Sequence, residues 1–145
     1  MNQTALLVIG GYTRGGAIAS VELLDTETGR WEKMADLPKR RYGHSCLMME
    51  WQGREGILVS GGALTGNEVD FLDLKTGKWE SFARLPFQTD GHKMVLVEGI
   101  PTVFSWQRIE QFDGKQWIDA EYSLSNSRSA FAITTVPGHL VPKCI

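Results

Sequence analysis

The fold is decided by a nine-residue stretch that occurs twice, first as Leu24-Asp25-Thr26-Glu27-Thr28-Gly29-Arg30-Trp31-Glu32 and then as Leu72-Asp73-Leu74-Lys75-Thr76-Gly77-Lys78-Trp79-Glu80. A shortened third copy reads Phe112-Asp113-Gly114-Lys115-Gln116-Trp117. Each copy predicts a tight hairpin turn, because the Asp side chain can cap nearby N–H groups and Gly can take a positive φ. The Trp after each turn is a large ring suited to the space between two packed sheets.

Other short motifs recur in the same order around these turns. Leu6-Leu7-Val8-Ile9-Gly10-Gly11 returns as Ile57-Leu58-Val59-Ser60-Gly61-Gly62, Leu37-Pro38 returns as Leu85-Pro86, and Gly43-His44 returns as Gly91-His92. The offsets are 48 residues from Trp31 to Trp79 and from Gly43 to Gly91, and 51 residues from Gly10 to Gly61. An ordered set of motifs at nearly constant spacing indicates a repeat protein built from short β-strands.

This set of motifs resembles the kelch repeat, with two good copies and one degenerate copy that together cover nearly the whole chain. The resemblance implies an all-β fold of kelch-type β-propeller blades, each with four antiparallel strands and its first strand innermost. Residues 1–145 then form a single domain, with blade 1 at about 5–38, blade 2 at about 42–86 and blade 3 at about 91–124. The strands predicted for these blades are Ala5–Ile9, Ser20–Asp25 and Trp31–Met34; Tyr42–Met49, Gly56–Ser60, Val69–Leu74 and Trp79–Phe82; and Lys93–Val97, Thr102–Ser105, Arg108–Phe112 and Trp117–Ala120.

The two ends of the chain complement each other in this assignment. Blade 1 lacks an innermost strand, whereas Ala130–Val136 is an apolar, uncharged and β-prone run that we predict to be a surplus innermost strand. This C-terminal strand would complete blade 1 of its own chain or of a partner chain. Because three blades are fewer than propellers normally contain, a head-to-tail homodimer with exchanged strands would close a six-bladed ring. The alternative is an open arc or a fragment of a longer propeller.

The composition favours an ordinary globular domain. A net charge of −2 argues against binding to nucleic acid or to a membrane surface. The two cysteines form no disulfide framework: Cys46 is expected to be a small buried side chain, and Cys144 an exposed thiol near the end. This cysteine usage favours a cytoplasmic location.

The sequence predicts no catalytic machinery, metal site or cofactor. His44 and His92 hold the same position in two repeats, which is typical of a structural role, and no His/Cys cluster has metal-ligand spacing. Some kelch proteins are mutarotases of carboxylated sugars, and this alternative needs acid–base groups in the pocket. The candidates for such groups here are Glu68 and Asp90.

A binding role is the preferred interpretation. Loops between strands two and three share one face with the connections between blades, and they are longer than the Thr-Gly turns on the opposite face. The resemblance implies that this loop face binds a protein or peptide, and its excess of arginines favours an acidic segment. Trp106 replaces the second Gly of the Gly-Gly pair and is a candidate aromatic anchor. The predicted binding residues are Tyr12, Arg14, Arg40, Arg41, Asn67, Gln88, Trp106, Arg108, Asn126 and Arg128.

Overall fold

The computed structural model describes residues 4–129 and 131–140, which form three separate antiparallel sheets. Blade 1 has the order β1-β2-β3 and contains β1 (Ala5–Thr13), β2 (Gly16–Asp25) and β3 (Arg30–Lys33). Blade 2 has the order β4-β5-β6-β7 and contains β4 (Ser45–Trp51), β5 (Arg54–Ser60), β6 (Val69–Asp73) and β7 (Lys78–Ser81). Blade 3 has the order β8-β9-β10-β11 and contains β8 (Lys93–Val97), β9 (Ile100–Ser105), β10 (Arg108–Phe112) and β11 (Trp117–Asp119).

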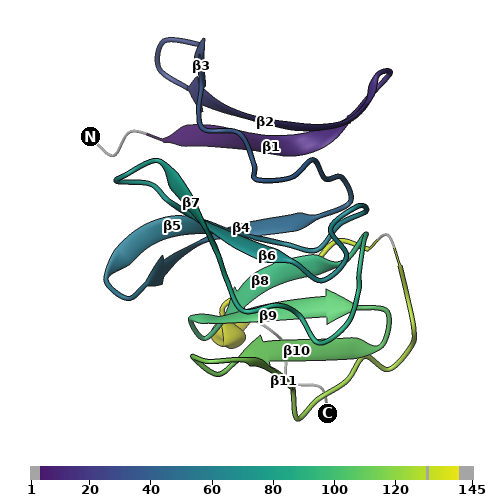
Figure 1. Ribbon diagram of the computed structural model, residues 1–145. Helices are drawn as coiled ribbons and strands as arrows, with labels where there is room; N and C mark the ends of the chain where they lie inside the picture. Colours follow the sequence, from purple (N-terminus) through teal and green to yellow (C-terminus); the bar gives the residue numbers. More distant parts are fainter. Residues whose placement is uncertain (1–3, 130, 141–145) are drawn as a thin grey trace.

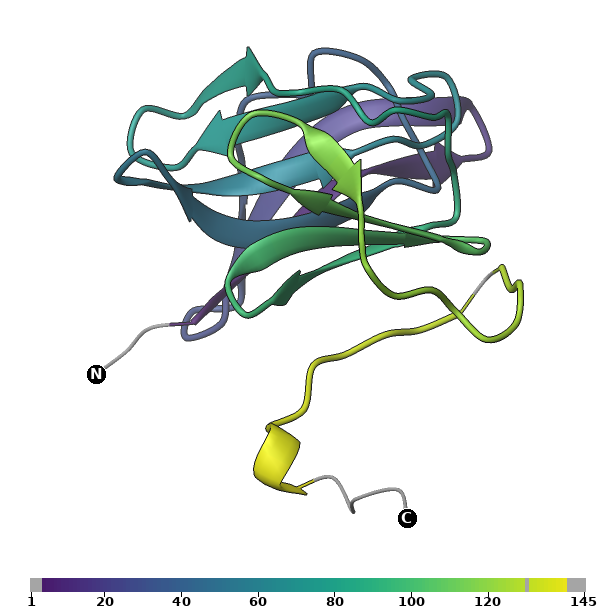
Figure 2. The ribbon, with the colours of Figure 1, turned by 90° about the horizontal axis from the view of Figure 1, so that it is seen from below.

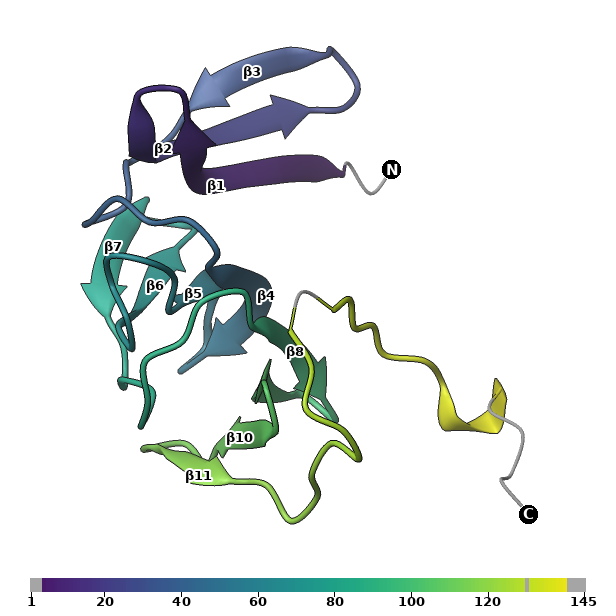
Figure 3. The same cartoon turned by 90° about the vertical axis from the view of Figure 1, so that its right-hand side faces the viewer.

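The three blades stack face to face and follow an arc (Figure 1). The strands β1, β4 and β8 lie on the inside of the arc, and β3, β7 and β11 lie on the outside (Figure 3). All the predicted strands of blades 1 to 3 are present, with ends shifted by a few residues. The largest extension is in β1 and β2, which run on past the Gly10-Gly11 pair to a turn at Thr13–Gly16. Within the described ranges, no helix is long and apolar enough to span a bilayer.

Apolar side chains from neighbouring blades form two cores. Between blades 1 and 2 the buried cluster contains Ile9, Val21, Leu37 and Val59. Between blades 2 and 3 it is larger and includes Leu58, Phe71, Met94, Val103 and Phe112. Because each β-strand alternates its side chains between two faces, the middle sheet contributes to both cores: Leu58 faces blade 3, whereas Val59 faces blade 1.

The turn chemistry predicted from the repeated stretch is confirmed in all three blades. Oδ1 of Asp25 accepts the backbone N–H groups of Glu27 and Thr28, at 2.8 and 3.2 Å. Asp73 and Asp113 each accept the N–H groups two and three residues further on, at 2.8–3.0 Å. Gly29 and Gly77 take φ values of 67° and 68°. The carboxylates therefore replace missing backbone acceptors, and they have no need of a catalytic explanation.

The repeated Trp residues join each blade to the one before it. The indole N–H of Trp79 donates to the carbonyl of Ala35 at 3.0 Å, and the indole N–H of Trp117 donates to the carbonyl of Ala83 at 2.8 Å. In both cases the acceptor lies just beyond the outermost strand of the preceding blade. Trp31 occupies the same position in blade 1, but it has no preceding blade within this chain and is 54% exposed.

The predicted C-terminal strand does not form within the chain. Residues 131–136 pair with no strand, and Ala130 lies outside the described residues. The tail leaves blade 3, at the far end of the arc from β1, and extends away from the sheets to a short 3₁₀ turn at Gly138–Leu140 (Figure 2). In the described residues β1 pairs only with β2, so the expectation that the tail completes blade 1 of its own chain is wrong.

Cys46 is exposed, contrary to the prediction of a buried side chain. It lies on β4, opposite Val59, on the face that looks toward blade 1. Met94 holds the equivalent place on β8 and is only 4% exposed, because β4 packs beside β8. In the part of the chain that the structure describes, blade 1 has three strands and lacks a fourth that would cover Cys46 in the same way. Cys144 lies outside the described residues.

Candidate functional site

The candidate site is the loop face, the side of the arc where the β1–β2, β5–β6 and β9–β10 turns meet the connections between blades. Figure 3 looks directly onto this face. The opposite side carries the tight turns after Asp25, Asp73 and Asp113, together with the short β4–β5 and β8–β9 turns. The antiparallel strand order therefore places the longer and more varied segments together, as the sequence predicts.

Packing between His and Gly holds the inner part of this face rigid. His92 is buried, and its Nε2 lies 2.8 Å from Ser60 Oγ. A Cβ on Gly61 would lie 2.8 Å from the His92 ring, and a Cβ on Gly10 would lie 3.1 Å from the His44 ring. Each Gly-Gly pair thus makes room for the His of the next blade, which confirms the structural interpretation of both His residues.

Burial keeps both His residues neutral. It lowers the pKa of His92 to about 4, with a smaller contribution from the nearby Lys93 ammonium. It also lowers the pKa of His44. Neither ring is therefore suited to act as a proton donor near pH 7.

The prediction that Arg41 is a binding residue is wrong. Its side chain is completely buried between blades 1 and 2, where the guanidinium pairs with the carboxylate of Asp70. It also donates to the carbonyls of Gly61 and Glu68, each at 3.5 Å. Because Asp70 is 29 residues away in the sequence, nothing in the local pattern distinguishes this buried Arg from its exposed neighbour Arg40.

A groove of about 580 Å³ lies in the loop face between blades 2 and 3. Its lining includes Leu64, Thr65, Asn67, Gln88 and Asp90. Leu64 is 73% exposed and has a φ of 76°, a conformation that costs free energy in a residue other than Gly. Leu64 is not among the predicted binding residues, because its place in the β5–β6 loop does not by itself reveal its exposure or its backbone conformation.

A second hollow adjoins this groove and shares Gln88 with it. It is lined by Phe87 and Trp106 among others, and its volume is about 310 Å³. Trp106 is 63% exposed. Its φ is 49°, because it stands at a position where blades 1 and 2 have a Gly with positive φ. The guanidinium of Arg108 lies over the Phe87 ring, 5.4 Å from its centre. Both predicted residues are thus accessible at one edge of the face.

The blade 1 part of the face combines cations with aromatic rings. Tyr12 and Tyr42 make an edge-to-face contact with ring centres 5.0 Å apart. Arg14, in the β1–β2 turn, and Arg40, in the connection to blade 2, are both exposed. Neither forms a salt bridge with the residues that the structure describes.

The remaining predicted binding residues differ in how accessible their side chains are to a partner. Asn67 is half-buried and donates from Nδ2 to the carbonyl of Leu85 at 2.9 Å, so its amide has a structural role. Gln88 and Asn126 are exposed. Arg128 is also exposed, and its backbone bridges to Trp106.

Glu68, an acidic residue of the face, is a poor proton donor. Oε1 of Glu68 lies 2.6 Å from Lys39 Nζ and 3.4 Å from Arg84, and the hydrogen bond from Lys39 lowers the pKa of Glu68. Glu68 is therefore held ionised at neutral pH. No group of three or more His, Cys, Asp or Glu residues that could hold a metal ion occurs in the described part of the chain.

A buried carboxyl group, Glu110, lies between blades 2 and 3 and pairs with the exposed Asp119. Glu110 is only 2% exposed, and burial together with its hydrogen bond to Asp119 raises the pKa of Glu110 to about 7. Glu110 stands in blade 3 where Asp70 stands in blade 2, because Val59 pairs with Asp70 and Val103 pairs with Glu110. The residue that corresponds to Arg41 is Thr89, which cannot supply a positive charge.

We predict that this pair makes the fold less stable as the pH rises. A carboxyl group with a raised pKa in the folded state stabilises the protein fully below its unfolded pKa of 4.5, and this contribution is lost as the pH passes 7. Chemical denaturation at pH 5 and pH 8 should show that Glu110→Gln gains on the order of 2 kcal/mol over the wild type between these two pH values. Parallel stability curves for the two proteins would contradict the assignment.

The family comparison agrees with the repeat structure. The model described as Kelch motif matches residues 2–38, which include all three strands of blade 1. The Asp-capped turn and the following Trp recur in blades 2 and 3, and the four-stranded order is the same in both. The chain carries a kelch motif at residues 2–38, and its three antiparallel sheets are consistent with kelch-type blades.

Proposed function

We propose that this chain is a non-catalytic protein-binding module whose loop face recognises an acidic segment of a partner protein. The observation that carries the proposal is the set of exposed arginines, Arg14, Arg40 and Arg108, none of which forms a salt bridge with the residues described. The proposal includes a cytoplasmic location, where the free thiol of Cys46 would stay reduced.

The contrast between the cations of this face supports acidic recognition. Lys39, Arg41 and Arg84 already have carboxylate partners within the chain. The guanidiniums of Arg14 and Arg40 have none among the described residues, and such groups can pair with carboxylates through two parallel hydrogen bonds. The free cations are thus the groups that an incoming acidic segment would neutralise.

Two exposed apolar side chains supply anchors beside these charges. Leu64 and Trp106 project from neighbouring loops in left-handed backbone conformations, and each borders a hollow. Large apolar side chains at the centre of an interface contribute more to affinity than charges at the rim. We expect the apolar residues of the partner to contact this pair while its acidic residues reach the arginines.

Charge reversal tests the proposal. A fluorescein-labelled hexaglutamate peptide serves as the probe, and its affinity is measured by anisotropy at low and at physiological salt. The double variant Arg14→Glu/Arg40→Glu should weaken binding on the order of tenfold or more, because two attractive charges become repulsive. The loss should be larger at low salt.

The matched control places the same charge change on the opposite face. Arg30 and Lys78 are exposed and lie next to the tight turns of blades 1 and 2. The variant Arg30→Glu/Lys78→Glu should bind the peptide as well as the wild type does. Equal losses in the two double variants would indicate a response to net charge alone and would overturn the proposal.

We also propose that residues 132–136 complete blade 1 of a second copy by pairing with its β1. The repeat spacing assigns the tail to the same place as the innermost strands of the other blades. Leu124 corresponds to Leu37 and Leu85, and the residue four positions after each of these leucines is equivalent in the three blades. By the same count, Ala132–Val136 corresponds to β8 (Lys93–Val97). A strand added beside β1 would cover Cys46 and Met48, which are both exposed on β4. Two chains would then make a closed six-bladed ring.

A further inference from the structure

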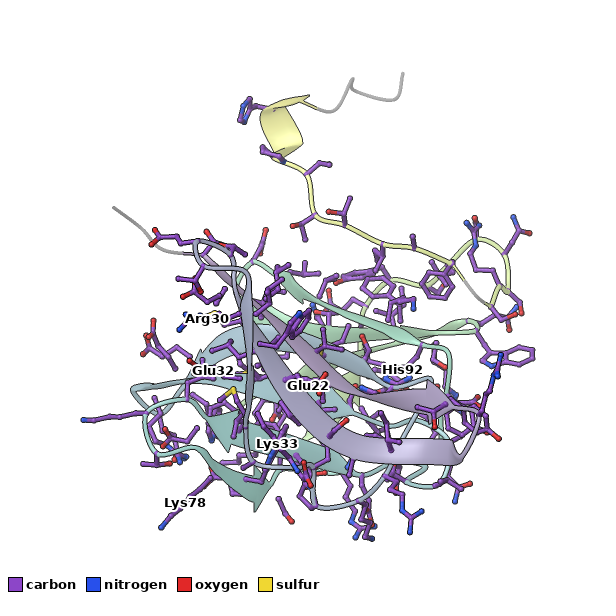
Figure 4. All side chains as sticks on the ribbon, turned by 90° about the horizontal axis from the view of Figure 1, so that it is seen from above. Glu22, Arg30, Glu32, Lys33, Lys78 and His92 are labelled. Atoms are coloured by element: carbon purple, nitrogen blue, oxygen red, sulfur yellow. The ribbon has the colours of Figure 1, made fainter. Side chains whose placement is uncertain are left out.

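The outer sheet face of blade 1 has the pattern of a blade interface without a neighbour (Figure 4). Val8 on this face is 49% exposed, whereas Val59 and Val103, which hold the equivalent positions in blades 2 and 3, are 0% exposed. Leu6 and Trp31 on the same face are 53% and 54% exposed. Contiguous apolar exposure of this kind marks a contact surface.

The ion pair that joins blades 1 and 2 has counterpart residues at the two ends of the arc. Arg41 from the connection after blade 1 pairs with Asp70 on the third strand of blade 2. The residue of blade 1 that corresponds to Asp70 is Glu22, because Val8 pairs with Glu22 as Val59 pairs with Asp70. Glu22 is exposed and has no salt bridge among the described residues.

The residue that corresponds to Arg41 after blade 3 is Arg128. Arg41 lies four residues after Leu37, and Arg128 lies four residues after Leu124. The backbones also lie beside equivalent residues, although the hydrogen bonds run in opposite directions: the N–H of Gly11 donates to the carbonyl of Arg41, whereas the N–H of Arg128 donates to the carbonyl of Trp106, the counterpart of Gly11 in blade 3. The counterpart after blade 2 is Thr89, which is not basic. An Arg at this position is therefore found after blades 1 and 3 but not after blade 2.

The indole N–H of Trp31 indicates a second contact with a neighbouring blade. Trp79 and Trp117 each donate to the carbonyl that lies four residues after the Trp of the preceding blade. Four residues after Trp117 is Glu121, beyond the last strand of blade 3. The outer face of blade 3 also presents Ile118 and Tyr122, which are 43% and 46% exposed.

We infer that the open face of blade 1 docks on the outer face of blade 3 of a second copy, with Glu22 of one chain paired with Arg128 of the other. In this arrangement Trp31 donates to the carbonyl of Glu121. The inference rests on the proposed strand exchange and specifies which side chains select a second copy. A head-to-tail ring contains this interface twice, so each chain contributes Glu22 to one and Arg128 to the other.

This symmetry allows a rescue experiment by mixing. Arg128→Glu opposes two carboxylates at both interfaces of its homodimer, and Glu22→Arg opposes two guanidiniums. We expect each variant alone to raise the dimer Kd at least tenfold in light scattering over a dilution series. An equal mixture of the two variants restores an opposite-charge pair at both interfaces, and should return the mass from 16.2 kDa to twice that value.

Glu32→Arg is the matched control, because Glu32 is an exposed residue of β3 between Trp31 and Lys33 that points to the other side of the strand. It should leave the dimer unchanged, and circular dichroism should show that all three variants are folded. A wild-type dimer that both charge reversals leave intact, or a mixture that stays monomeric, would refute the Glu22–Arg128 pair alone. A monomeric wild type at all concentrations would refute the strand exchange itself.

Discussion

Replacing Arg41 with methionine should lower the free energy of unfolding by about 3 kcal/mol, the usual cost of removing one partner from a buried ion pair. The guanidinium is completely buried and offsets the charge of Asp70. Burial raises the pKa of Asp70, and the positive charge of Arg41 opposes this rise. Without Arg41, the Asp70 carboxyl must be either protonated or buried as an unpaired charge. Urea denaturation of the two proteins at pH 7 measures the difference.

Two further variants show whether the ion pair is the cause. Arg40→Met changes an adjacent but exposed side chain, and should cost less than about 0.5 kcal/mol. Arg41→Met/Asp70→Leu removes the orphaned charge as well, and should be more stable than Arg41→Met alone. If Arg41→Met were no more harmful than Arg40→Met, the buried pair would have no role in joining blades 1 and 2.

Replacing Gly56 with alanine should have a comparable effect, of about 3 kcal/mol, through a clash in the larger core. A Cβ on Gly56 would lie 2.1 Å from Cζ of Phe71 and 2.4 Å from the carbonyl oxygen of Leu72. Phe71 is completely buried and belongs to the cluster between blades 2 and 3, so its ring has little room to move. Thermal unfolding followed by circular dichroism gives the loss directly.

Gly53→Ala separates this clash from the conformational cost of losing a glycine. Gly53 has a φ of 72°, but a Cβ there would meet no atom within 4 Å. The expected cost is about 1 kcal/mol, from backbone strain alone. A loss in Gly56→Ala no larger than that in Gly53→Ala would show that the core accommodates the extra methyl group.

The fold was predictable from the sequence because its determinants are local and repeated. The Asp-capped turn needs contacts only two or three residues apart, and its three copies fix the positions of the outer strands. The order of motifs then supplies the remaining strands of each blade. The same logic located the loop face, since antiparallel strands place alternate turns on opposite sides.

The details of the site depended on contacts between distant residues. The burial of Arg41 follows from Asp70, and the exposure of Cys46 follows from the absence of a strand opposite β4. Neither fact is visible in a local pattern. Leu64 was missed because a single apolar residue in a loop resembles any other until its φ and exposure are known. The tail strand was predicted from its composition, but pairing also requires an unoccupied strand edge within reach.

The central claim is that the loop face of this chain binds acidic peptide, and NMR tests it most directly. Hexaglutamate is titrated into ¹⁵N-labelled protein, and the backbone amide shifts are followed residue by residue. We expect the largest changes in the β1–β2 turn, in the β5–β6 loop around Leu64 and around Trp106. Changes confined to the tight turns after Asp25, Asp73 and Asp113 would place binding on the opposite face and contradict the account.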